Sequence, residues 1–357
     1  MAPSLPTGFF ILLCSSMKRK IILIIILVLL LGGAFTAWQC FGPTVSSPEG
    51  RYIYIKTGST YDDVKRELLD KGVIGGTFFF DKIAKYVKYP SSVKPGRYQV
   101  KNGMSLVNLV RMLRSGNQAP VKLVITKLRT KEDLAQKIAA NFECDSASVM
   151  ALLGNNDSLH HYHLDSNTAM TAVIPNTYNI LWNSSPSRIF SKLNNEKEKF
   201  WTDERTRKAS ALNLTPDQVY TMASIVEEET NAEEDKGKIA SVYMNRIETG
   251  MKLEADPTVK FAMRDFGLKR IYNVHLQYPS PYNTYLHTGL PPGPICTPSI
   301  NTIDAVLNAP QTNYIFFVAK PDFKGLSNFA ATYAEHMQYA KAYRDALDSL
   351  MKRRANP

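Results

Sequence analysis

Three consecutive glutamates, Glu227, Glu228 and Glu229, stand where one expected helix ends and another begins. A carboxyl group can act as a general acid there if its surroundings hold its pKa near neutral pH. Continuing the apolar stripe of the first helix at roughly 100° per residue puts Glu228 on the opposite face, in water. Glu229 then falls at one edge of the stripe and Glu227 near the other, so periodicity only slightly favours Glu229.

Two interpretations of these glutamates differ in how much water surrounds them. A carboxylate at the edge of an apolar stripe is partly desolvated, and desolvation raises its pKa toward the range that a general acid needs. The alternative is a solvated helix end, since acidic side chains also suit the first turn of the helix that follows. Composition alone favours the second interpretation.

The two expected helices are well marked. Residues 215–218 (TPDQ) give the first a hydroxyl cap, a proline at its first position and a capping-box glutamine. Its apolar stripe consists of Val219, Met222, Ala223 and Val226. The second helix buries Ile239, Val242, Tyr243 and Ile247, and Gly250 is placed to end it.

Residues 253–298 have a different composition, rich in Pro, Tyr, Asn, Thr and Gly. Aromatic and polar side chains on stiff loops suit a carbohydrate groove, because flat rings cover sugar faces while amides and hydroxyls bind their hydroxyl groups. The alternative is a long structural loop, although a structureless insertion of this length is uncommon in a compact domain.

Length, charge and composition bound the function. The 357 residues are 44% hydrophobic and 21% charged, enough for two or three globular domains, and carry a formal charge of +11. This charge favours acidic partners such as nucleic acid, anionic lipid or the carboxylate-bearing polymers of a cell wall. No nucleic-acid motif is found, and the basic residues are scattered rather than gathered in one tract.

An uncharged apolar run at residues 21–38 follows Lys18, Arg19 and Lys20. It approaches the roughly 20 residues that cross a bilayer, and the positive charges predict that residues 1–20 stay in the cytoplasm while the rest lies outside. A cleaved signal peptide is the alternative. Met17 is a natural start, so residues 1–16 are interpreted as a start-site error.

A strand followed by a capped helix recurs in the next region, residues 50–125. The copies begin at residues 51–56 with Thr60 and at residues 121–126 with Thr130, and a looser third copy covers residues 97–116. Short strands paired with amphipathic helices predict small α+β modules. These resemble LysM-type modules, which bind glycans containing N-acetylglucosamine; the alternative is a spacer without a ligand.

Six segments, in the same order over roughly residues 120 to 345, carry a family resemblance. They are residues 223–230 (ASIVEEET), 240–247 (ASVYMNRI), 253–259, 282–285 (YNTY), 289–298 (GLPPGPICTP) and 314–319 (YIFFVA). Together they resemble the endolytic murein transglycosylases, the MltG or YceG-like family. The family's essential glutamate immediately precedes a threonine, which implies that Glu229 is catalytic. Glu228 departs from the pattern, in which lysine or a similar residue stands there.

The resemblance implies cleavage of the β-1,4 bond between N-acetylmuramic acid and N-acetylglucosamine in nascent strands. The product would be a 1,6-anhydro-muramyl end formed without water. Asp256, Asn283 and Tyr285 are expected to position the sugar. No metal or organic cofactor is expected, and the family suggests work beside peptidoglycan synthases in terminating strand elongation.

Two other functions stay open. One is a two-carboxylate hydrolase that uses Glu229 with Asp256, and the other is a wall-binding scaffold without catalysis. A metallopeptidase is disfavoured because the six histidines show no ligand spacing. The expected fold is α+β: a transmembrane helix (residues 21–38), LysM-like modules (50–125) and a mixed α/β catalytic domain (126–350).

Overall fold

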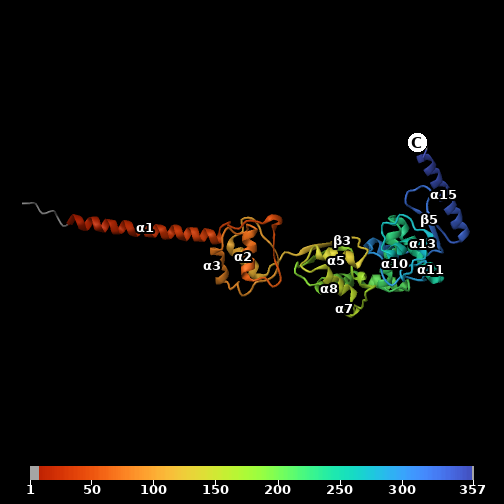
Figure 1. Ribbon diagram of the computed structural model, residues 1–357, viewed down its shortest axis with the longest axis horizontal. Helices are drawn as coiled ribbons and strands as arrows, with labels where there is room; N and C mark the ends of the chain where they lie inside the picture. The colour runs from red at the N-terminus through yellow and green to blue at the C-terminus, as the bar shows by residue number, and fades with distance from the viewer. Residues whose placement is uncertain (1–7, 356–357) are drawn as a thin grey trace, which may run out of the picture. The chain divides into compact units, whose positions relative to one another are not determined.

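The computed structural model describes the backbone of residues 8–355 and the side-chain surroundings of residues 19–352, so the first seven of residues 1–16 lie outside the description. The fold is mixed α/β. Two compact units make up the chain (Figure 1). The first unit holds the residues up to 120 together with 181–183, and the second holds residues 121–180 and those from 184 onward.

The first unit begins with the long helix α1 (Gly8–Phe41). Its segment Arg19–Phe41 is long and apolar enough to cross a membrane, and it includes the expected span at residues 21–38. Because the whole segment lies in one continuous helix, its backbone polar groups bond to one another, as a passage through lipid requires.

The remaining elements of the first unit surround a small sheet. They are η1 (Glu49–Arg51), β1 (Tyr52–Ile55), α2 (Tyr61–Asp70), α3 (Phe78–Tyr86), β2 (Gly96–Gln99) and α4 (Leu106–Ser115). β1 pairs antiparallel with β2, and Ile53, Leu68, Phe80 and Tyr98 are fully buried between the sheet and the helices. The looser copy at residues 97–116 is a strand and a capped helix, β2 and α4, but β2 completes the sheet that β1 opens and so belongs to the first copy.

The second unit opens with the same order of elements. They are β3 (Val121–Ile125), α5 (Lys131–Ala139), α6 (Ser146–Gly154), α7 (Asn156–His160), η2 (Ala169–Ala172) and β4 (Asn176–Ile180). β3 and β4 again pair antiparallel. Thr60 and Thr130 both cap their helices in complete capping boxes, with Asp63 and Asp133. The recurring strand-helix pair is thus the start of a larger unit, β-α-α-β in the first unit and the same with α7 and η2 added before β4 in the second.

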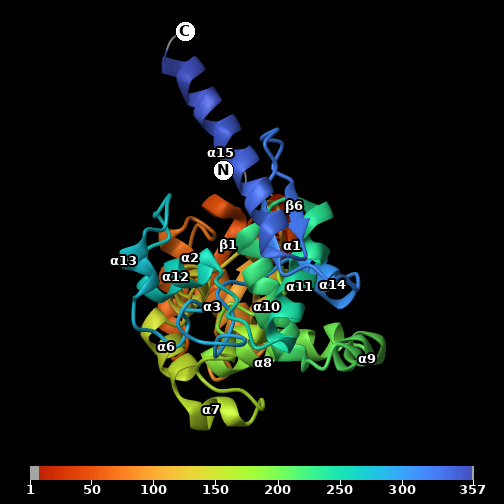
Figure 2. The same cartoon turned by 90° about the vertical axis from the view of Figure 1, so that its right-hand side faces the viewer.

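The rest of the second unit is mainly helical (Figure 2). Its elements are α8 (Pro186–Phe200), α9 (Asp203–Ala211), α10 (Pro216–Glu229), α11 (Glu233–Glu248), α12 (Asp256–Met263), α13 (Asn273–Leu276), α14 (Ile300–Leu307), β5 (Phe316–Ala319), β6 (Ser327–Ala330) and α15 (Tyr333–Ala355). The charged stretch at residues 185–208 forms two helices, because Thr202 caps α9 and interrupts the run. β5 and β6 form an antiparallel pair beside α15.

The proline-rich region is not structureless. It contains α12 and α13, and its segment 291–298 is almost wholly buried rather than lining a surface groove. The Ile295 amide donates to the Ser224 hydroxyl of α10 at 3.0 Å. Gly293 passes so close to the Asn167 carbonyl that a Cβ would lie 2.1 Å from its oxygen. This segment therefore braces the central helix.

Candidate active site

Helix α10 carries the three glutamates and is enclosed by its neighbours. It begins as predicted: the Gln218 amide donates to the Thr215 hydroxyl at 3.2 Å, and the Thr215 amide donates to the Gln218 side chain at 2.8 Å. Residues 219–226 are all buried, because α9, α11, α12 and α14 pack around this helix. The last residues of α10 are therefore surrounded largely by other parts of the protein rather than by water.

Glu228 is held by two cations. Arg129 donates to both of its carboxylate oxygens, at 3.1 and 3.0 Å, and the Lys127 ammonium lies 2.8 Å away. Burial alone would raise the pKa of Glu228, but the two cations outweigh it and hold that pKa below its ordinary value. The prediction that Glu228 points into water is wrong, because its side chain is only 16% exposed and helix α10 has no solvated face at its end.

Glu227 is also held in place. The hydroxyls of Ser299 and Thr302, at the start of α14, both donate to its Oε2 atom, the former at 3.0 Å. The Lys236 ammonium of α11 lies 3.6 Å from the same oxygen. These contacts join α10 to two neighbouring helices, so Glu227 is a structural residue.

Glu229 differs from both neighbours. Its Oε2 atom is buried, and among the described residues no hydrogen-bond partner reaches it. Burial, reinforced by the charge of Asp256, raises the pKa of Glu229 from 4.5 to about 7, while the nearby Tyr243 hydroxyl and Lys260 ammonium offset part of the rise. Because Glu229 ends α10, the negative pole of the helix also disfavours its charged form. A carboxyl group with this pKa can donate a proton near neutral pH.

Glu229 opens into a cavity of about 360 Å³. Asp256, at the start of α12, lines the same cavity, and its carboxylate accepts a hydrogen bond of 2.7 Å from the Tyr285 hydroxyl. The structure thus brings together three of the four residues singled out from the sequence. Their arrangement supplies a proton donor and, beside it, a fixed negative charge.

Asn283 has a different place from the one expected. It is fully buried, and its amide donates to the carbonyls of Leu276 and Tyr278 at 3.0 and 2.9 Å. Its side-chain oxygen accepts from the Tyr285 amide at 3.0 Å. The expectation that Asn283 positions sugar directly is wrong, because these bonds use its polar atoms to shape the loop that carries Tyr285.

Sequence reasoning missed other residues of this cavity. Arg246 is buried and donates to the carbonyls of Ile315 and Leu253 at 2.8 and 3.0 Å, which ties α11 to the cavity floor. It lies in segment 240–247, which carries part of the family resemblance. His336 comes from α15, and burial lowers its pKa, so it is uncharged at neutral pH. No local pattern links α15 to Glu229.

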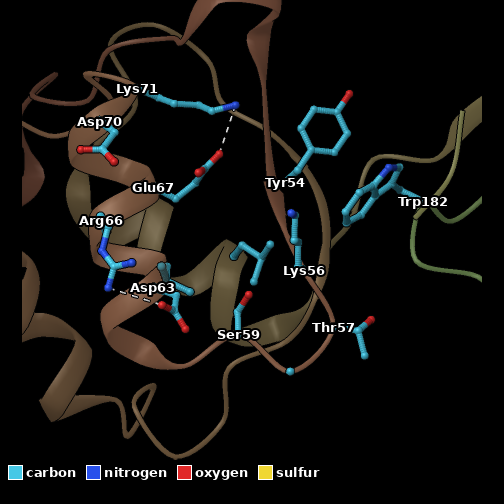
Figure 3. Close-up of a pocket in the computed structure, with 13 residues that line it drawn as sticks. Tyr54, Lys56, Thr57, Ser59, Asp63, Arg66, Glu67, Asp70, Lys71 and Trp182 are labelled. Carbon is cyan, nitrogen blue, oxygen red and sulfur yellow. Dashed lines mark ion pairs between the residues drawn. The ribbon is translucent and has the colours of Figure 1, made fainter. Parts of the chain in front are cut away.

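A second hollow, of about 630 Å³, lies on the first unit (Figure 3). Tyr54 and Trp182 stand on one side of it, with ring centres 5.0 Å apart. On the other side α2 presents two ion pairs, Lys71 with Glu67 at 3.1 Å and Arg66 with Asp63 at 3.5 Å. The hollow therefore combines aromatic faces with charged hydrogen-bonding groups.

Comparisons with known proteins agree on one family. The sequence model of the YceG-like family matches residues 53–342. The endolytic murein transglycosylase of Bacillus subtilis is 28% identical over 311 residues, which cover 82% of this chain and 84% of that relative. The Streptococcus pneumoniae protein of the same name is 26% identical, and the match covers 75% of this chain but only 54% of that relative. A solved YceG-like protein from Listeria monocytogenes has a TM-score of 0.53 and 26% identity, over 80% of this chain and 97% of that structure.

The unusual state of Glu229 predicts a cost in stability at neutral pH. Its pKa is higher in the folded than in the unfolded chain, so the free energy of unfolding falls as pH rises from about 4.5 to about 7. Glu229→Gln removes that penalty. We expect the variant to gain about 1–3 kcal/mol over the unchanged protein at pH 8, and little at pH 5, in calorimetric unfolding.

Glu228→Gln is the matched control, one residue away. The low pKa of Glu228 contributes stability above its ordinary pKa, and this is lost as pH falls through the folded value. We expect this variant to be less stable than the unchanged protein at pH 8, with a smaller difference near pH 4. A loss of stability in Glu229→Gln at pH 8 would contradict the assignment of Glu229 as a desolvated acid with a raised pKa.

Proposed function

Because this chain belongs to the YceG-like family, we propose that it is a lytic transglycosylase that acts on peptidoglycan. One observation carries the proposal: of three adjacent carboxyl groups, only Glu229 lacks a partner for its buried oxygen, and it faces a cavity. Glu228 is held in ion pairs, and Glu227 accepts hydrogen bonds from hydroxyl groups. A single acid poised near neutral pH is what a lytic reaction requires.

The proposed reaction needs no water. Protonated Glu229 gives its proton to the oxygen of the β-1,4 bond between N-acetylmuramic acid and N-acetylglucosamine. As the bond from the anomeric carbon to that oxygen breaks, the C6 hydroxyl of the muramic acid attacks the same carbon. The Glu229 carboxylate takes the hydroxyl proton, and a 1,6-anhydro end results.

Asp256 and Tyr285 support this reaction from the cavity wall. The transition state at the anomeric carbon is positively charged. We assign Asp256 to stabilise that charge and to keep Glu229 protonated before the reaction, because its own negative charge raises the pKa of Glu229. The Tyr285 hydroxyl fixes the orientation of the Asp256 carboxylate through their 2.7 Å hydrogen bond.

A two-carboxylate hydrolase is the second candidate. It is favoured by the same observation, since Asp256 lines the cavity with Glu229 and could activate water or form a glycosyl ester. The two reactions leave different ends on the cut strand: anhydro for the lytic reaction and reducing for hydrolysis.

We further propose a location and a second glycan contact. Helix α1 would cross the inner membrane once, with the positive residues before it in the cytoplasm and both units outside, beside the peptidoglycan synthases. The first unit would act as a LysM-like module that holds a glycan strand in the hollow of Tyr54 and Trp182, where sugar faces can cover the rings.

Product analysis tests the reaction. Full-length protein incubated with uncrosslinked glycan strands should release fragments with anhydro-muramyl ends, detected by mass spectrometry. Glu229→Gln should lower the rate of fragment release by at least about a thousandfold, because the proposed proton donor at the bond is lost. Glu228→Gln should retain the same product. Reducing ends from the unchanged protein would reject the lytic reaction in favour of hydrolysis.

Asp256→Asn separates the two mechanisms by its pH profile. Removing this charge lowers the pKa of Glu229, so the alkaline fall in kcat/KM should begin at a lower pH than in the unchanged protein. At pH 5 the lytic enzyme should still form anhydro ends. Complete loss of product at every pH would instead assign Asp256 an essential role as base or nucleophile.

Glycan retention tests the first unit. In full-length protein carrying Glu229→Gln, Tyr54→Ala and Trp182→Ala should each weaken binding to insoluble peptidoglycan by about tenfold, equal to about 1.4 kcal/mol. Tyr86→Ala, an exposed aromatic outside the hollow, is the control in this sedimentation assay. If the Glu229→Gln parent and its three further variants all bound equally well, the first unit would be a spacer that does not bind glycan.

A further inference from the structure

Helix α1 is joined to the first unit by a short, hydrogen-bonded connection. The Gly42 amide donates to the Trp38 carbonyl at 2.7 Å, and the Thr44 hydroxyl donates to the Gln39 carbonyl at 3.1 Å. Val45 then pairs with Met104, its amide donating at 3.1 Å. The connection therefore has little freedom, and the unit is fixed to the end of the apolar helix.

Helix α3 lies beside that end of α1 (Figure 1). The Phe79 ring of α3 packs edge-on against Phe35 of α1, with ring centres 6.1 Å apart. The next positions on this face, Phe78, Lys82 and Tyr86, follow one another at i, i+4 and i+8 and form one stripe. Phe78 is 66% exposed and Tyr86 is 88% exposed. The ring contacts of Phe78 stay within α3 itself, with the Phe79 ring at 5.1 Å and the Lys82 ammonium at 5.7 Å.

The contact with Phe35 fixes the level of α3 along α1. Phe35 lies six residues before the end of the apolar segment Arg19–Phe41, which is about 9 Å along a helix. If this segment crosses a bilayer, α3 lies where the hydrocarbon meets the headgroups. Aromatic side chains are enriched at that level, and Trp38 and Phe41 of α1 are exposed there too.

Charge on α3 matches the same surroundings. Lys82, Lys85 and Lys88 are all exposed, and none of them forms an ion pair with any residue that the structure describes. Their long side chains can reach lipid phosphates while the rings stay in the apolar layer. Isolated exposed aromatics are ordinary on protein surfaces, but this stripe continues directly from a membrane-crossing segment.

We propose that α3 is a membrane-surface helix, with Phe78 and Tyr86 in the interfacial layer of the bilayer that α1 crosses and its lysines on lipid phosphates. The inference rests on the proposed anchor. It gives the first unit a fixed side toward the lipid, rather than free rotation about a tether.

Depth-dependent quenching tests this in full-length protein. The protein is reconstituted in vesicles of phosphatidylethanolamine and phosphatidylglycerol whose acyl chains are brominated either near the carbonyl or near the chain middle. With Trp182→Phe and Trp201→Phe, the remaining Trp38 reports on the anchor. Adding Trp38→Phe and Tyr86→Trp moves the single tryptophan to α3. The control has all three native tryptophans replaced by Phe, keeps Tyr86, and carries Arg66→Trp on α2, where the Arg66 side chain is 70% exposed.

The expected result is loss of emission from the Tyr86→Trp probe comparable to that of Trp38, stronger with bromine near the carbonyl, while the Arg66→Trp probe is unaffected. Replacing Lys82, Lys85 and Lys88 by Gln should reduce the quenching. Quenching of Trp38 without quenching at position 86 would overturn the inference and leave the anchor standing. Absence of quenching at both positions would overturn both. The probe at position 86 could instead be shielded from water, as a blue-shifted emission would show, without being quenched by bromine. If that shielding grew with the number of protein molecules per vesicle, the stripe would contact a second copy of the chain and the lipid contact would be rejected.

Discussion

The burial of residues 219–226 of α10 is the constraint on which the second unit depends. This buried stretch is followed directly by three carboxylates at the end of the helix. Charges that leave water need partners, so the surrounding elements supply them. Lys127 and Arg129 come from the loop after β3, Ser299 and Thr302 from the start of α14, and Lys236 from α11. The same contacts hold these elements against α10.

Leaving one carboxyl oxygen without a hydrogen-bond partner then produces a proton donor, at a cost in stability. Glu229 needs no special device, since burial, the helix end and the charge of Asp256 act together on its pKa. Its surroundings stay rigid because its two neighbours are clamped. The β-α-α-β repeat contributes to this arrangement in the second unit, where the loop between its first strand and helix carries the cations for Glu228. The equivalent loop of the first unit, at residues 56–59, lines the hollow with Trp182 instead.

Local features of the structure could be predicted from the sequence, and tertiary ones could not. The caps at Thr60, Thr130 and Thr215 depend on residues three positions apart, so their patterns are visible in the chain. Periodicity failed for Glu228 because it assumes one buried and one exposed face, whereas residues 219–226 of α10 are buried on every side and Glu228 meets two cations. Asn283 was misassigned because the same amide that suits a sugar also suits backbone carbonyls, and only the fold determines which it meets.

The shielding of the Glu229 oxygen has a consequence for turnover. In the proposed reaction the acid that protonates the leaving oxygen recovers a proton from the substrate's own C6 hydroxyl, so each cycle ends with the carboxyl as it began. Such an acid never has to be reloaded from bulk solvent, and a buried, partnerless oxygen imposes no delay between one cut and the next. In that reaction one cut can therefore follow another without a proton from bulk solvent.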